Sequence, residues 1–136
     1  MNAGTLAYLL DTGWIVRHLR GQRAYTESIA SRASEGLAVS VISVAELQEG
    51  VALATDRERA VQSLATFLST VTVLPVEEET SRIFGDLSAG LRRKGNHPGD
   101  FDTLIAATAT QYELTLLTTD VDDFSRFDGL TLVTAP

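Results

Sequence analysis

Residues 99–124 read GDFDTLIAATATQYELTLLTTDVDDF, and this stretch decides the fold class of the chain. It predicts a helix that begins near Asp100 and Asp102 and carries small apolar residues, followed by a buried strand over residues 114–118. Three further acids follow this strand at once: Asp120, Asp122 and Asp123. Helix starts and the carboxyl ends of strands are where an α/β fold exposes its binding edge. Carboxylates at both places indicate metal chemistry.

The rest of the chain alternates strands with helices. Short apolar runs predict further strands over residues 6–10, 37–40, 71–74 and 130–133. Helices are predicted over residues 13–19, 24–33, 43–54 and 56–68. Another is predicted after Pro75, with a buried stripe at Ile83, Leu87 and Leu91. Asn96, Pro98 and Gly99 indicate a loop before the quoted stretch. This order predicts an α/β fold with a central parallel sheet of four to five strands and helices on both faces.

The composition indicates one soluble globular domain over residues 1–136, with 44% hydrophobic and 21% charged residues. The absence of cysteine excludes disulfides and thiolate-bound zinc, and it fits a reducing compartment. The first residues lack a basic leader, and Asp11 interrupts the early apolar run, which argues against a signal peptide. No apolar segment reaches the ~20 residues of a membrane helix. We therefore expect a cytoplasmic protein without membrane contact.

The net charge of −7 argues against a nucleic-acid-binding surface, because such surfaces are usually basic. The basic residues are nevertheless clustered, at Arg17, Arg20 and Arg23 and again at Arg92, Arg93 and Lys94. Each cluster is either solvated helix surface or a phosphate contact.

Two acids in the first third of the chain each allow two interpretations. Asp11 follows the first predicted strand and precedes a helix, so it is either a metal ligand at the sheet edge or a helix N-cap. Glu46 lies in the sequence Ser43-Val-Ala-Glu46, which is the pattern of a capping box. Its carboxylate either returns to the Ser43 amide or turns toward the sheet edge and joins a metal site.

The acids of the last third divide in a similar way. Either Asp100 or Asp102 is expected to cap its helix, which leaves the other for a different role. Asp120 stands nearest the strand end, whereas Asp122 and Asp123 are expected in a surface turn. Three glutamates are expected only to complement a helix dipole: Glu77, Glu78 and Glu79.

Other site chemistries are poorly supported. His18 and His97 are the two histidines, and neither lies in a recognisable Ser/His/Asp arrangement. The sequence also has no glycine-rich phosphate loop. Ligands that offer only oxygen favour Mg²⁺ or Mn²⁺ over zinc.

Four sequence blocks together resemble the PIN-domain ribonucleases, and more narrowly the VapC toxins of bacterial toxin–antitoxin pairs. They are LLDT at residues 9–12, SVISVAEL at 40–47, DTLIAATA at 102–109, and LLTTD at 116–120 with Phe124. FDGLTLV at residues 127–133 resembles the closing strand of the family. Each block alone is weak evidence, but their order and the chain length make the resemblance strong.

The resemblance implies a PIN-like fold with its acids at the carboxyl edge of the sheet. Asp11, Glu46 and Asp102 match the three core carboxylates, and Asp120 matches the fourth position. Three hydroxyl residues are expected to support these ligands: Thr12, Ser43 and Thr118. The chain departs from the family at Gly13, where Asn or Ser is common, and Asp100 and Asp123 add negative charge.

The resemblance also implies a metal-dependent endoribonuclease toxin of a type II toxin–antitoxin system, with Mg²⁺ or Mn²⁺ as cofactor. Clustered carboxylates repel one another by several kcal/mol per pair, about 4 kcal/mol at ~4 Å, so they require cations or protons. One or two ions would meet this need. The candidates for contact with the RNA backbone are Arg17, Arg20, Arg92, Arg93 and Lys94.

Two partners are implied as well. One is a cognate VapB-type antitoxin whose tail occupies the site, with residues 43–68 as a clamp for it, and the other is a second copy in a homodimer.

Two other classes of protein stay in view. The first is a PIN-like binding module without catalysis that acts through a protein partner. The second is another acidic α/β enzyme, such as a haloacid-dehalogenase-type phosphatase or a phospho-receiver domain. The phosphatases need a second Asp two residues after Asp11, which is absent here. Receivers need a lysine at a strand end, whereas Lys94, the only lysine, is predicted in a polar loop.

Overall fold

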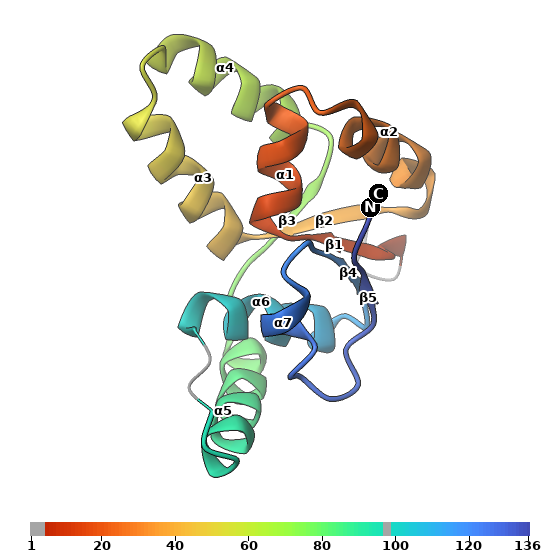
Figure 1. Ribbon diagram of the computed structural model, residues 1–136, viewed down its shortest axis with the longest axis vertical. Helices are drawn as coiled ribbons and strands as arrows, with labels where there is room; N and C mark the ends of the chain where they lie inside the picture. Colours follow the sequence, from red (N-terminus) through yellow and green to blue (C-terminus); the bar gives the residue numbers. More distant parts are fainter. Residues whose placement is uncertain (1–4, 97–98) are drawn as a thin grey trace.

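The protein is described from a computed structural model that covers residues 5–96 and 99–136 (Figure 1). Five strands form one sheet, and all of their pairings are parallel. The order across the sheet is β3-β2-β1-β4-β5. The strands are β1 (Tyr8–Leu10), β2 (Leu37–Ser40), β3 (Thr72–Leu74), β4 (Thr115–Leu117) and β5 (Leu132–Val133). The predicted fold class is therefore confirmed.

Helices connect the strands. They are α1 (Thr12–Leu19), α2 (Arg23–Arg32), α3 (Val41–Leu53), α4 (Arg57–Leu68), α5 (Glu78–Arg93), α6 (Asp100–Gln111) and α7 (Val121–Phe124). A short 3₁₀ turn, η2 (Ala33–Glu35), follows α2. The sequence pattern placed most of these helices to within one or two residues and missed only the four-residue α7. Of the predicted loop before α6, Pro98 lies outside the described residues, as does His97.

The two faces of the sheet carry separate hydrophobic cores. Figure 1 shows α1 to α4 on one side of the strands and α5 to α7 on the other. Leu9 and Leu116 belong to the core that contains Ile105 of α6, whereas Leu10 and Leu117 belong to the core around α1. Successive strand residues point to opposite faces, so a strand buried on both faces is apolar throughout.

The strand order creates a switch point between β1 and β4. The chain adds β2 and β3 on one side of β1, and then returns to add β4 and β5 on the other side. The connections after β1 and β4 therefore diverge and leave a crevice at the carboxyl ends of these strands, where open α/β sheets bind ligands. Asp11 and Thr118 directly follow these two strands.

Among the described residues, no helix combines the length and apolar character needed to cross a membrane.

Candidate metal centre

Asp11 lies at the carboxyl end of β1 with only 7% of its surface exposed. It caps α1, because its Oδ1 accepts a hydrogen bond of 2.8 Å from the Thr12 backbone N–H. Its other oxygen, Oδ2, accepts a bond of 2.7 Å from Thr118 Oγ1, at the end of β4. The N-cap interpretation is thus confirmed, and the capping residue lies at the switch point, where its role as a metal ligand stays a prediction.

The surroundings of Asp11 disfavour its charge. Burial raises the pKa of this carboxyl, and the charges of Glu46 and Asp120 raise it further, while the bonds from Thr118 and Thr12 act in the opposite direction. The two neighbours show that carboxylates from three distant segments lie close enough to interact.

Glu46 is held by side chains and not by a capping box. Ser40, the last residue of β2, caps α3 by accepting a 3.1 Å bond from the Ile42 N–H. Ser43 is therefore a buried residue within α3, and the predicted capping box is wrong. Glu46 Oε1 instead accepts a 2.7 Å bond from Thr12 Oγ1, which also lies 2.9 Å from Ser43 Oγ. These hydroxyls hold the glutamate beside the start of α1.

The acids of α6 and α7 form the second half of the site. One carboxylate oxygen from each of Asp102, Asp120 and Asp123 lies within 4.8 Å of the others. Asp120 caps α7 by accepting a 3.3 Å bond from the Asp123 N–H. Its own N–H donates to Thr118 Oγ1 at 3.0 Å. Thr118 therefore links Asp11 to the segment that carries Asp120.

Two predictions about this half are wrong. Gly99 is the N-cap residue of α6, so neither Asp100 nor Asp102 caps this helix. Asp100 is exposed, while Asp102 is half-buried among the other acids. Asp123 was expected in a surface turn with Asp122, but it is half-buried and belongs to the cluster. Its spacing of three residues from Asp120, one helical turn, was the signal that could have identified it.

The cluster carries uncompensated negative charge. Burial raises the pKa of Asp102 to about 7, with added repulsion from Asp11, Asp120 and Asp123. The pKa of Asp120 is also raised, chiefly by burial. Within the described part of the chain, one ion pair reaches the cluster, between Arg126 Nη2 and Asp123 Oδ1 at 3.8 Å. A set of carboxylate and hydroxyl oxygens with excess negative charge suits Mg²⁺ or Mn²⁺.

The basic residues lie at different places around this centre. Arg17 Nη1 donates to the Gly13 carbonyl at 3.2 Å, and its guanidinium lies 5.6 Å from the centre of the Tyr25 ring. A Cβ at Gly13 would lie 3.4 Å from Arg17 Nη1, an ordinary van der Waals contact, so a small side chain also fits here. Arg20 is exposed and is the C-cap residue of α1. Three others lie at the end of α5: Arg92, Arg93 and Lys94.

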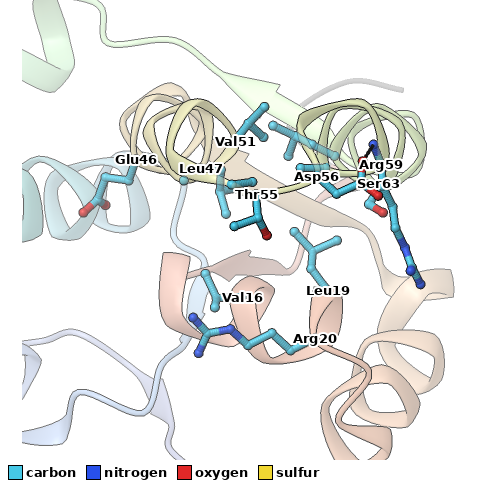
Figure 2. Close-up of a pocket in the computed structure, with 14 residues that line it drawn as sticks. Val16, Leu19, Arg20, Glu46, Leu47, Val51, Thr55, Asp56, Arg59 and Ser63 are labelled. Carbon is cyan, nitrogen blue, oxygen red and sulfur yellow. Dashed lines mark hydrogen bonds between the residues drawn. The ribbon is translucent and has the colours of Figure 1, made fainter.

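A groove begins beside Glu46 and runs between α1, α3 and α4 (Figure 2). Its volume is about 390 Å³, and its apolar lining includes Val16, Leu19 and Leu47. Figure 2 shows Glu46 at one end of the groove and Arg59 at the other. A second cavity of about 470 Å³, between α1, α2 and α4, shares Leu19 and Ser63 with the first.

The profile of the PIN domain matches residues 8–130. The chain belongs to the PIN-domain family. It is 37% identical over 123 residues to Ribonuclease VapC10 of Mycobacterium tuberculosis, covering 90% of this chain and 89% of that protein. Ribonuclease VapC2 of Rickettsia felis is 30% identical over 129 residues, covering 93% and 96%. The resemblance to VapC-type PIN-domain ribonucleases is thus confirmed.

Solved structures agree with this assignment to the PIN-domain family. VapBC2 from Rickettsia felis, bound to a promoter DNA fragment, superposes with a TM-score of 0.88 at 29% identity, over 94% of this chain and 98% of the other. FitAcB from Neisseria gonorrhoeae superposes with a TM-score of 0.82 at 29% identity, over 92% and 95%.

Proposed function

We propose that this PIN-domain protein is a Mg²⁺- or Mn²⁺-dependent endoribonuclease, the toxin of a type II toxin–antitoxin system, which cleaves phosphodiester bonds in RNA. The observation that carries the proposal is the convergence of Asp11, Glu46, Asp102 and Asp120 on the β1/β4 switch point. Repulsion between the carboxylates of Asp11 and Asp102 joins the first and last thirds of the chain at this point. The names of the VapC relatives support the same activity.

Each carboxylate has a role suited to its surroundings. Asp11 and Asp102 are the first metal ligands, because both are buried or half-buried with a raised pKa. Asp120 holds a second ion or a water of the outer shell. A divalent cation in such a site lowers the pKa of bound water and stabilises the leaving oxygen of an in-line displacement.

Glu46 is the residue best placed to hold a proton during hydrolysis or to complete the ligand set. Thr12 donates a hydrogen bond to Oε1 of Glu46 and so orients the side chain. The other oxygen, Oε2, does not take part in this bond. Ser43 keeps Thr12 in place. In the first role, Glu46 orients the attacking water and accepts its proton.

Contact with the RNA backbone is assigned to the basic residues at the rim. Arg17 is the best supported, because its guanidinium is fixed at Gly13, two residues after Asp11. The other candidates are Arg20, Arg92, Arg93 and Lys94. Charge-assisted bonds to phosphate from these residues offset part of the repulsion from a chain of net charge −7.

A VapB-type antitoxin is the proposed protein partner. The similar structures from Rickettsia felis and Salmonella typhimurium are VapBC complexes. The groove between α1, α3 and α4 suits an apolar segment of such a partner, and it leads to Glu46, where an arginine of the partner would meet the acids. A homodimer and a cytoplasmic location complete the proposal.

RNA cleavage by the purified protein tests this function. Single-stranded RNA should be cut with Mg²⁺ or Mn²⁺ and left intact with EDTA. Asp11→Asn should abolish cleavage, whereas Asp122→Asn, a change at an exposed acid on α7, should leave it unchanged. A protein that binds its antitoxin but cuts no RNA with either metal would instead be a non-catalytic binding module.

A further inference from the structure

Phe101 differs from every other aromatic side chain of the protein. The chain has five Phe, three Tyr and one Trp, all within the described residues, and only Phe101 is exposed, at 54%. It belongs to neither hydrophobic core. The aromatic pairs found among the described residues do not include Phe101 either. Its ring therefore contributes little to the packing of the fold.

The place of Phe101 makes its exposure informative. It lies in the first turn of α6 and directly precedes Asp102, so the Cα atoms of these two residues are about 3.8 Å apart. Two more exposed apolar side chains stand at similar positions. Val121 follows Asp120 and is 43% exposed, and Val41 follows the N-cap of α3 and is 38% exposed.

These three exposed apolar residues share a position at helix starts along the carboxyl edge of the sheet. In the described part of the chain, they are half of the six large apolar residues that are exposed. Each lies in the first turn of a helix whose start carries or adjoins residues of the acidic site. A single exposed apolar residue needs no explanation, but three beside one site indicate a surface for an apolar ligand group.

The charge of the site decides what that group is. Phosphates next to the scissile one meet the repulsion of the site acids and a net charge of −7. The basic residues offset only part of this repulsion, whereas the uncharged bases of the neighbouring nucleotides are not repelled. Base–aromatic stacking is independent of net charge and tolerates different sequences, because every base has a π-face.

We propose that Phe101 is the platform on which an unpaired nucleobase next to the scissile phosphate stacks. The proposal rests on the ribonuclease function proposed above. A base inside an RNA helix already has both faces stacked and cannot offer one to Phe101, and sequence-specific RNA binding generally uses unstacked bases.

Cleavage by substituted proteins tests the platform. The substrates are a short fluorescent single-stranded RNA and the same RNA in a duplex. Phe101→Ala should lower kcat/KM on the single strand about 5- to 100-fold, and Phe101→Trp should keep most of the activity. Val61→Ala, at a residue of 51% exposure on α4, is the matched control and should have no effect. The duplex should be a poor substrate for the wild type.

A modified RNA locates the contact. RNAs that lack one base at a time are compared. At one position, removal of the base should lower kcat/KM as much as Phe101→Ala does, and the substituted protein with that RNA should show no further loss. Phe101→Ala should also keep the rise in Tm that Mn²⁺ gives the wild type. A smaller rise would mean that Phe101 only supports Asp102, which would overturn the platform.

A binding measurement separates this inference from the proposed function. A single-stranded RNA with 2-aminopurine at the located position, or at each position in turn if no RNA is cut, should lose fluorescence on binding, and less so with Phe101→Ala. If the wild type cuts RNA and Phe101→Ala cuts it equally well, the platform is wrong and the nuclease stands. If the wild type neither cuts RNA nor quenches the probe, both are wrong.

Discussion

Two groups of three acids can be compared, one at the start of α5 and one at the carboxyl edge of the sheet. In the first, which comprises Glu77, Glu78 and Glu79, each residue is exposed. Arg82 contacts Glu79, and its hydrogen bond lowers the pKa of that carboxyl. In the second, Asp102, Asp120 and Asp123 are half-buried, and burial raises the pKa of Asp102 to about 7.

The difference shows that acids which stabilise a fold and acids which form a functional site can be distinguished by their burial and their partners. At α5, water and Arg82 satisfy the charges, and Glu77 has a structural role because it accepts a 2.7 Å bond from Tyr112 OH. At the sheet edge, the charges repel one another and the fold holds them together at a cost. The composition of a cluster is thus less informative than its burial and its partners.

Amide substitutions in the two groups should give the widest contrast in activity. Asp102→Asn removes a proposed metal ligand and should lower kcat for RNA cleavage by a factor on the order of 10³ or more. Glu79→Gln should leave kcat unchanged. Asp100→Asn, at an exposed acid in the same turn as Asp102, is the matched control. Equal activity of the Asp102 and Asp100 variants would contradict the distinction.

Metal binding should stabilise the protein through the sheet-edge group alone. Mg²⁺ or Mn²⁺ at about 100 times its Kd should add about 2.7 kcal/mol to the free energy of unfolding, which corresponds to a rise of several degrees in Tm. Asp102→Asn should lose most of this rise in a thermal melt, and Glu79→Gln should keep it. A rise that persists without Asp102 would place the ion elsewhere.

Without metal, the stability of the protein should fall as the pH rises from 4 to 8. Folded Asp102 keeps its proton up to about pH 7, whereas the unfolded value is near 3.8, so the folded state binds more protons in this window. Because Asp102 is only half-buried and water screens its charge, we expect a loss of about 1–2 kcal/mol. Denaturant unfolding of wild type and Asp102→Asn across this range measures it.

The Asn variant should show a flatter pH profile and should be more stable than the wild type at pH 8, because the repulsion is gone. A steeper profile in the variant would mean that another group titrates.

The smallest effect is expected at α5. Glu79→Gln removes an exposed ion pair between residues one helical turn apart, and water and salt screen such pairs so that they contribute little to stability. Chemical denaturation at low and at high salt should show this loss at low salt only. A loss that persists at high salt would mean that Glu79 has a structural role besides this ion pair.

The sequence predicted the fold well because its signals are local. Apolar runs of four or five residues marked all five strands, and the acids that follow β1 and β4 reach the sheet edge because parallel strands end there together. The supporting roles of Thr12, Ser43 and Thr118 were predicted only from the family resemblance. Local patterns could not predict them, because their hydrogen bonds join residues far apart in the chain, such as Thr12 and Glu46.

The residue that caps the N-terminus of α3 could not be predicted from the sequence. Two serines three residues apart compete to begin α3, and the choice depends on where β2 ends. Because Ser40 still pairs in register with Leu74 on β3, the helix begins directly after it and Ser43 falls inside. Asp123 was misjudged because the four-residue helix α7 is too short for a periodic pattern.

The bond between Thr118 and Asp11 also has a consequence for the order of events during folding. It joins residues 107 positions apart, and closing such a long loop is slow compared with forming local helices. A chain still emerging from the ribosome lacks β4 and the aspartates of α6 and α7, so its first two carboxylates stand alone. The acidic cluster therefore depends on a contact between the first and last thirds of the chain, and a chain truncated before β4 lacks half of it.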